Sequence, residues 1–266
     1  MIYDLQKASM MKRVSAFLLD FILIIILATG FMWLISTVTG YDNYTNGIST
    51  KLAEIQAKHN IPAISEEYKV NISEYEVLSK EEQEKYPEEV RVVFDACIEE
   101  INSNQEIRHT YVMIMSLTVL MVSLSLFLST FLLEFVVPII LKNGQTVGKK
   151  VFALAVVRID GVRVTPVIMF VRSILGKYTV EMMIPIIIIL MMFFGVGSIV
   201  TLAVIPLLLI FELILVVATK TNSFIHDILS STVLVDFPSQ MIFDSVEAKI
   251  EYQARLHSEE AKNAKY

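Results

Sequence analysis

The apolar residues of this chain are gathered into three long blocks, which polar segments separate. The blocks cover residues 14–38, 110–141 and 182–218. About 20 apolar helical residues cross the ~30 Å hydrocarbon core of a bilayer, so each of the first two blocks predicts one transmembrane helix. The third block is too long for a single span and is interrupted by the sequence Gly-Val-Gly-Ser at 195–198. It therefore predicts two shorter spans, one ending near residue 194 and one over 199–218.

The pattern divides the chain into six consecutive parts. They are an N-terminus with the first span (1–38), an insertion (39–109), the second span (110–141), a connection (142–181), the third and fourth spans (182–218) and a tail (219–266). In the insertion, apolar residues recur at helical spacing over 90–101, which predicts helices. The last of these helices could run directly into the second span.

The connection and the tail predict a small folded unit beside the membrane. The apolar run that begins at residue 151 meets an Asp160-Gly161 pair, which suits a tight hairpin because both residues tolerate positive φ. With the later run 232–236, we expect three short strands over 151–158, 161–165 and 232–236. Thr165 and Pro166 predict the start of a helix over 167–180, which mixes apolar and basic residues and is expected to lie in the membrane interface. The predicted fold class is an all-α membrane protein with four transmembrane helices, a small cytoplasmic β-sheet and a helical extracellular insertion.

Composition and charge agree with a membrane protein and suggest its orientation. Of the 266 residues, 55% are hydrophobic and 19% charged. Segments 1–38, 142–181 and 219–266 carry 15 of the 22 lysines and arginines, and the positive-inside rule places such segments in the cytoplasm. Both termini are therefore expected to be cytoplasmic, with the first span a retained signal anchor and 39–109 extracellular. The net charge of −6 comes mainly from that insertion, so it is not a nucleic-acid signature.

The sequence contains no motif that indicates an enzyme or a metal site. A single cysteine, Cys97, excludes an intrachain disulfide and a paired-cysteine metal site, and the four histidines are scattered along the chain. The sequence Gly-Gln-Thr-Val-Gly-Lys-Lys at 144–150 lacks the glycine spacing and the Ser/Thr of a phosphate loop. No nucleophile and base are recognisable as a pair. We therefore expect neither an enzyme nor a cofactor or metal.

Three carboxylates interrupt the spans at a similar depth. Asp20 follows Arg13 by seven residues, and Glu134 and Glu212 each precede a lysine by eight, which places each acid ~10–12 Å inside the boundary set by its flanking base. A charge at a helix centre costs ~2.5–3.5 kcal/mol or more. One interpretation is an ion or proton site formed by these three acids, with Arg13 and Arg172 as charge partners. The alternative is structural: Asp20 bonds Arg13, Arg172 or backbone groups, and the two glutamates reach water. In either case we expect Arg13 and Asp20 to face the bundle interior, with Arg172 or another base within reach of a carboxylate, because an unpaired charge facing lipid is too costly.

Three separated motifs resemble those of the RDD family of membrane proteins. The opening Lys-Arg-Val-Ser-Ala-Phe-Leu-Leu-Asp at 12–20 resembles the family's first-helix pair, matched here by Arg13 and Asp20. The middle segment resembles the family's Gly-Gln-Thr-x-Gly-Lys pattern, and the closing segment resembles its His-Asp-x-Leu-x-x-Thr pattern. The matching residues are Gly144, Gln145, Thr146, Gly148, Lys149, His226, Asp227 and Thr232, and Arg172 falls where the family often has an arginine.

The resemblance implies a multi-pass protein of the bacterial cytoplasmic membrane, for which transport has been proposed but no shared activity is firm. The insertion is not part of it, since the family's connection there is usually much shorter. We expect Asp227 to lie outside the membrane and to act as a helix cap or charge partner beside His226.

Two function classes remain. One is exchange of a monovalent cation, Na⁺ or K⁺, against H⁺ through Asp20, Glu134 and Glu212; four spans are few for a transporter, so this version calls for a homo-oligomer. The other is a membrane scaffold or accessory protein that docks a membrane protein partner, which the large acidic insertion favours.

Overall fold

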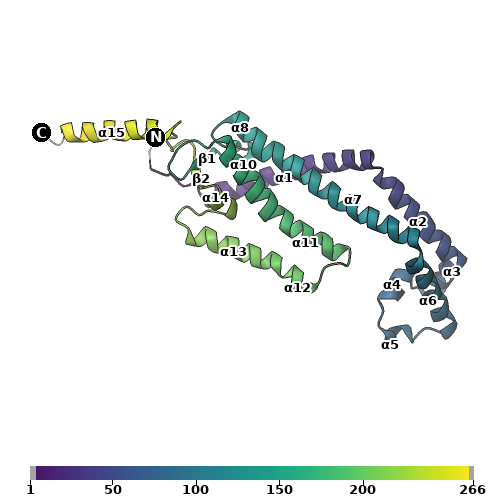
Figure 1. Ribbon diagram of the computed structural model, residues 1–266. Coiled ribbons are helices and arrows are strands. Elements are labelled where there is room, and N and C mark those ends of the chain that lie inside the picture. Colours follow the sequence, from purple (N-terminus) through teal and green to yellow (C-terminus); the bar gives the residue numbers. More distant parts are fainter. Residues whose placement is uncertain (1–3, 264–266) are drawn as a thin grey trace. The chain divides into compact units, whose positions relative to one another are not determined.

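The computed structural model describes residues 4–263 and is mainly helical (Figure 1). Four helices are long and apolar enough to cross a membrane, at Met10–Thr39, Gln105–Leu141, Pro166–Phe193 and Ile199–Ala218. This confirms the predicted fold class of four membrane-type helices with a small sheet and a helical insertion. The chain separates into two compact units, residues 33–121 and the remainder.

The first span is the single helix α1 (Met10–Thr39), and the other three are each assembled from shorter pieces. The second span joins α7 (Gln105–Thr130), the π-helical turn η1 (Phe131–Val136) and α8 (Val137–Leu141). The third joins α10 (Pro166–Phe170), the π-helix η2 (Val171–Met183) and α11 (Ile184–Phe193). The fourth joins α12 (Ile199–Leu202) and α13 (Val204–Ala218).

The third span differs from its expected form. Residues 167–180 are not a separate interfacial helix but the first half of a continuous helix that begins at Pro166, where the Thr165 side chain accepts a hydrogen bond from the backbone N–H of Ile168. The basic residues that suggested an interfacial position, Arg172 and Lys177, have buried carboxylate partners instead. Their charges are therefore compensated within the protein.

Both π-helical segments end two residues before a proline. η1 precedes Pro138 and η2 precedes Pro185. A proline inside a helix lacks the N–H for the usual i to i−4 bond, and its ring crowds the carbonyl one turn earlier. Widening the preceding turns to i to i+5 bonding relieves this conflict, and such segments occur often at functional sites.

The sheet has two strands rather than the three expected. β1 (Leu154–Arg158) pairs antiparallel with β2 (Thr232–Asp236), with Leu154 opposite Asp236. The tight turn at Gly161 forms as expected, with φ 79°, but residues 161–165 contribute only an isolated bridge from Arg163 to Val157. Beyond the turn, the Arg163 N–H donates to the carbonyl of Phe243 (2.8 Å), so this segment leaves the edge of β1 and pairs with the tail.

Both faces of this sheet are covered. Leu154, Val156 and Leu234 pack with alanines of the N-terminal segment, and Ala155, Val157, Val233 and Val235 form a second cluster on the other face. Short helices flank the strands: α9 (Val147–Val151) precedes β1 and α14 (Ile225–Leu229) precedes β2. A final exposed helix, α15 (Val246–Asn263), follows the sheet. The sheet therefore fixes where α9 and α14 present their side chains.

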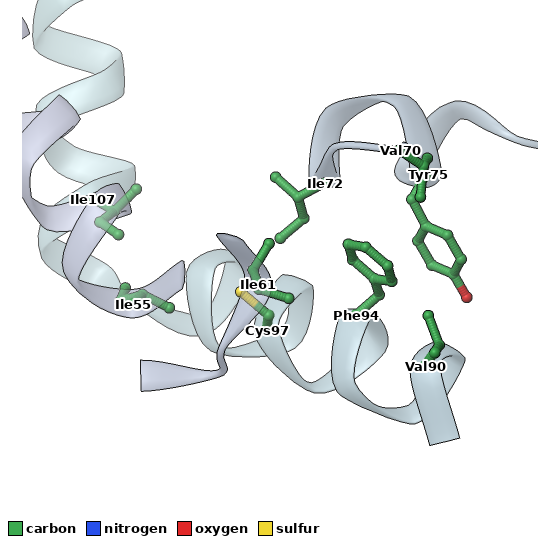
Figure 2. Packing of buried hydrophobic residues seen from close by; sticks show 9 residues of the cluster. All are labelled: Ile55, Ile61, Val70, Ile72, Tyr75, Val90, Phe94, Cys97 and Ile107. Carbon is green, nitrogen blue, oxygen red and sulfur yellow. The ribbon is translucent and has the colours of Figure 1, made fainter. Parts of the chain in front are cut away.

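The unit at 33–121 carries the insertion as a bundle of short helices with its own core (Figure 2). Its helices are α2 (Tyr41–Lys58), α3 (Ile61–Tyr68), α4 (Ile72–Val77), α5 (Lys80–Gln83) and α6 (Glu88–Ser103). Tyr75 stacks on Phe94 with ring centroids 4.5 Å apart, and both are buried with Cys97. The helical spacing seen over 90–101 thus marks a core face. Asn104 adopts an extended conformation and caps α7, so α6 does not continue into the second span.

Candidate functional site

Asp20 is held by the loop and short helix that follow the second span. Its side chain is buried, with 2% of its surface exposed. One carboxylate oxygen accepts a hydrogen bond from the Thr146 hydroxyl (2.5 Å) and the other from the backbone N–H of Gly148 (2.7 Å). Neither bond involves Arg13 or Arg172, but the bond from Gly148 is to a backbone group, which the structural alternative also considered. The carboxylate therefore joins α1 to the N-terminus of α9.

Gly148 makes this approach possible. A Cβ at this position would lie 2.3 Å from the backbone oxygen of Ala16 and 2.9 Å from the Asp20 carboxylate. Only glycine therefore fits against α1 here. The requirement explains why a glycine stands at this point of the middle motif.

A cluster of alternating charges continues from Asp20 into the second and third spans. Lys149 Nζ lies 3.3 Å from the Thr146 hydroxyl and 3.3 Å from a carboxylate oxygen of Glu134. The other Glu134 oxygen accepts a hydrogen bond from Lys177 of η2. We call Asp20, Thr146, Lys149, Glu134 and Lys177 the lysine cluster. Burial lowers the pKa of Lys149, and the nearby Glu134 and Asp20 only partly oppose this.

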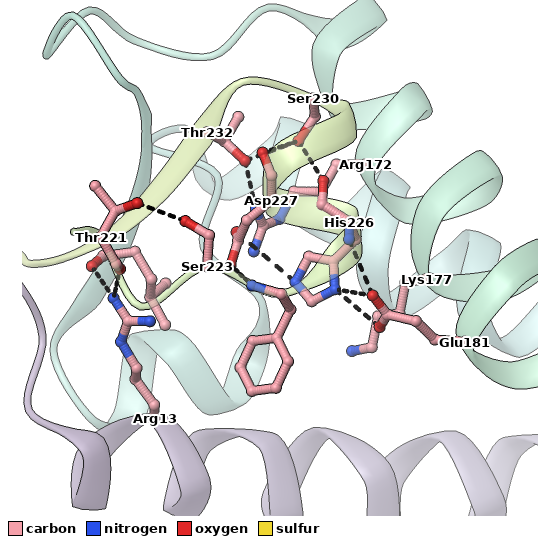
Figure 3. A network of polar contacts seen from close by, with 12 residues as sticks. Arg13, Arg172, Lys177, Glu181, Thr221, Ser223, His226, Asp227, Ser230 and Thr232 are labelled. Atoms are coloured by element: carbon pink, nitrogen blue, oxygen red, sulfur yellow. Dashed lines mark hydrogen bonds and ion pairs between the residues drawn. The ribbon is translucent and has the colours of Figure 1, made fainter. Parts of the chain in front are cut away.

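Arg172 and Asp227 form a second buried pair, on the side of the small sheet (Figure 3). The Arg172 guanidinium donates to the Asp227 carboxylate and to the Thr232 hydroxyl (2.5 Å). Asp227 also accepts from the backbone N–H of Phe224 (3.2 Å), which caps α14. Burial would raise the pKa of Asp227, but Arg172, His226 and the Phe224 N–H outweigh it and lower that pKa to about 2. The expected capping and pairing role of Asp227 agrees with this geometry.

His226 links this pair to a carboxylate of the third span that the sequence analysis did not identify. Its Nδ1 lies 2.7 Å from one oxygen of Glu181 and 2.8 Å from the other, and its backbone N–H donates to the same side chain (3.0 Å). Its Nε2 lies 3.8 Å from Asp227. The imidazole thus stands between the partly buried carboxylate of Glu181 and the buried carboxylate of Asp227 (Figure 3).

Glu212 belongs to this region and not to the lysine cluster. It lies close enough to Glu181 for the two carboxyl groups to interact. Its Oε1 is buried and makes no hydrogen bond to the residues that the structure describes. We call His226, Glu181 and Glu212 the histidine cluster. Lys177 interacts electrostatically with Glu181, so the lysine and histidine clusters are neighbours.

The π-helix η2 explains how the third span reaches these partners. Arg172 and Glu181 both contact residues of α14, although nine positions separate them. At about 3.6 residues per turn, nine positions correspond to two and a half turns and opposite faces. The roughly 4.4 residues per turn of i to i+5 bonding make nine positions about two turns, and thus one face. Between them Gly176 packs against His226, whose Cα would lie 2.7 Å from an added Cβ.

Arg13 has a different role from the one expected. Its guanidinium donates to the backbone carbonyls of Asn222 (2.6 Å), Leu234 (2.9 Å) and Thr221 (3.2 Å). It therefore holds the loop after the fourth span against β2. The side chain is buried, as expected, but its partners are carbonyl groups rather than Asp20.

The structure thus brings two of the three predicted acids together, through Lys149, and places Glu212 beside an acid that was missed. Of the remaining motif residues, Gln145 donates to the carbonyl of Leu154 (2.8 Å). Gly144 has φ 61°, where an added Cβ would lie 2.8 Å from Val156. These contacts fasten the middle motif to β1. Within residues 4–263, no group of three or more His, Cys, Asp or Glu side chains could hold a metal ion.

Comparison with known proteins gives one match. The model of the RDD family matches residues 7–231, which is most of the chain. No curated protein and no solved structure matches. The matched range contains all the residues of the lysine and histidine clusters.

Proposed function

Because the chain belongs to the RDD family of membrane proteins, we propose that its buried charges bind and release protons in exchange for a monovalent cation. The observation that carries the proposal is the connection between the lysine and histidine clusters. In it carboxylates alternate with ammonium groups from Asp20 through Lys149, Glu134 and Lys177 to Glu181, which contacts both the His226 imidazole and the Glu212 carboxyl group. Such alternation allows protons to pass between neighbouring groups.

Two details of the network favour proton exchange over simple packing. The first is Lys149, whose lowered pKa makes its ammonium a better proton donor than a lysine in water. The second is Glu212, whose buried oxygen lacks a hydrogen bond among the described residues. Leaving a buried polar atom unsatisfied costs about 1–3 kcal/mol, so this oxygen is a favourable place for a proton or a cation to bind.

The proposal includes a homo-oligomer in a bacterial cytoplasmic membrane. In the most apolar windows of the four long helices, no more than 28% of residues are buried, and in the fourth helix only 6%. Second copies can cover these faces and complete a pathway that four helices do not enclose. The distribution of lysine and arginine supports an orientation with both termini in the cytoplasm and residues 39–109 outside.

A scaffold or accessory protein is the second candidate function. It is favoured by the compact unit at 33–121, whose helices bury a core of their own. An exchanger has no evident need of such a unit, whereas a protein that docks a membrane protein partner does.

Proton flux in liposomes separates the two candidates. Purified protein is reconstituted with a pH-sensitive dye inside, and Na⁺, K⁺ or Li⁺ is added outside. We expect cation-driven proton movement in the wild type, and its loss in Glu134→Gln and Glu212→Gln. Glu251→Gln, which changes an exposed acid of α15, is the matched control and should retain flux. Absence of flux with every alkali cation at mildly acidic, neutral and alkaline pH would falsify the exchange proposal and leave the scaffold.

A further inference from the structure

A cavity open to the surface lies beside the start of the third span, and none of the residues of the lysine and histidine clusters lines it. Its volume is about 380 Å³, within the ~300–1,000 Å³ range of ligand pockets. Three elements contribute its lining, namely the end of β1, the first turns of the third span, and the segment between α14 and β2. The lining residues are Arg158, Val167, Ile168, Val171, Leu229, Ser230 and Ser231.

The charged group that lines this cavity is a guanidinium. Arg158 is the one charged residue of its lining, and its side chain is 35% exposed. Among the described residues its side chain has one charged partner, Asp160, at 2.7 Å from Nη2. A guanidinium carries five N–H donors in a planar fork, which matches the geometry of a phosphate. Ser231, which is an exposed residue, also lines the cavity.

The surroundings of the cavity are apolar and exposed. Val167 and Leu229, which line it, expose 71% and 53% of their surface. Their neighbours Ile159, Phe170 and Ile228 are also exposed, at 41–58%. Exposed apolar side chains gain little from contact with a water-soluble ligand, whereas they pack favourably against the acyl chains of a lipid. Val167 and Phe170 belong to the first turns of a membrane-type helix, where we expect hydrocarbon to meet headgroups.

We propose that this cavity binds the phosphate group of an anionic phospholipid. Arg158 and Ser231 would hold the phosphate, and the exposed apolar side chains would contact the acyl chains. Basic pockets beside transmembrane helices bind lipid headgroups in this way. The lipid would thereby fasten the sheet and α14, which carry the partners of Arg172 and Glu181, to the membrane surface.

Native mass spectrometry of the full chain tests the site with defined lipids. The protein in detergent is titrated with phosphatidylglycerol and with phosphatidylcholine, and retained lipid is counted. We expect retention of phosphatidylglycerol over phosphatidylcholine, and a loss of about tenfold in its affinity in Arg158→Gln, since one charge-assisted pair is removed. Arg163→Gln is the matched control: this arginine pairs with Asp244 and does not line the cavity.

A third variant guards against misfolding of Arg158→Gln. Asp160→Asn keeps an oxygen that can accept from the Val162 N–H (3.1 Å) but removes the charge that competes for Arg158, so it should bind phosphatidylglycerol more tightly. Equal retention of both lipids in the wild type, unchanged affinity in Arg158→Gln, or unchanged affinity in Asp160→Asn would each overturn the proposal. Displacement of the lipid by millimolar inorganic phosphate would also overturn it, because the site would then serve a free anion.

Discussion

At the scale of single residues, the buried charges of this protein are compensated by partners from distant parts of the chain. Arg172 meets Asp227, and Glu134 meets Lys149 and Lys177. Removing one partner of such a pair leaves an uncompensated buried charge, which costs about 3–5 kcal/mol. An exposed pair is worth only about 0–1 kcal/mol. The Lys12–Asp236 pair, whose side chains are 43% and 25% exposed, approaches this second class.

Asp227→Asn should therefore destabilise the protein by about 3–5 kcal/mol, while Asp236→Asn should cost about 1 kcal/mol or less. Thermal unfolding of both variants in detergent measures the difference. A similar melting temperature for the two would show that the Arg172–Asp227 pair is no stronger than an exposed one.

The same carboxylate gives a pH dependence with a definite sign. The pKa of Asp227 is about 2 in the folded protein and about 3.9 in an unfolded chain. The unfolded state binds the proton more readily, so this contribution to stability is complete above pH ~4 and is lost as the pH falls through about 2. We expect the stability difference between wild type and Asp227→Asn to shrink on acidification over this range, as measured by denaturation. A constant difference would contradict the assignment.

At this scale the sequence predicts which charges are buried but not their partners. Asp20, Arg13 and Arg172 are buried as expected, because a charge facing lipid is too costly. Their partners depend on how α9, α14 and the sheet pack. The spacing of residues along one span shows which side chains share a helix face, but not what that face meets. Glu181 was missed for the same reason: only the fold shows that it meets His226.

At the scale of elements, the long apolar blocks are sufficient to predict four spans, whereas the π-helices are not predicted. The length of an apolar block matches the thickness of the hydrocarbon core, so it predicts a span. Whether a helix widens from α to π geometry depends on its contacts with other elements. Gly176 is one such contact, since it lets η2 approach α14. The prolines at 138 and 185 were visible in the sequence and mark where both wide segments end.

Two glycine substitutions separate close packing from helix propensity. In Gly176→Ala the new Cβ would lie 2.7 Å from His226 Cα, and we expect a loss of about 1–3 kcal/mol from overpacking. Gly47→Ala, in α2, meets nothing within 4 Å and should instead stabilise by about 0.5–1 kcal/mol. Chemical denaturation gives both values. Equal effects of the two changes would argue against a tight contact between η2 and α14.

At the scale of the whole molecule, the chain consists of two compact units with different sources of stability. The unit at 33–121 has an apolar core with Cys97 at its centre. The other unit combines the buried charges with a sheet covered on both faces. In the sequence, the acidic segment at 39–109 lies within the unit at 33–121.

The orientation of these parts is testable by cysteine labelling. In a Cys97→Ala background, Lys85→Cys should react with an impermeant reagent added outside cells, because the positive-inside rule places the insertion there. Glu259→Cys in α15 should react only after permeabilisation. Both positions are exposed, so a difference reports the side of the membrane. Labelling of Glu259→Cys in intact cells would reverse the proposed topology.

The width of η2 also constrains how the third span can vary in length. Its contacts to α14 come from an arginine and a glutamate nine positions apart. An α-helix would need a separation near seven or eleven to bring the same two side chains to one face. Deleting one residue between Arg172 and Glu181 would thus turn one of these side chains away from α14, so the helix cannot be shortened here without loss of a contact. Two charged residues that contact the same helix from positions nine apart, with a proline after the second, therefore form a pattern. A π-helical segment can be recognised by this pattern in a sequence.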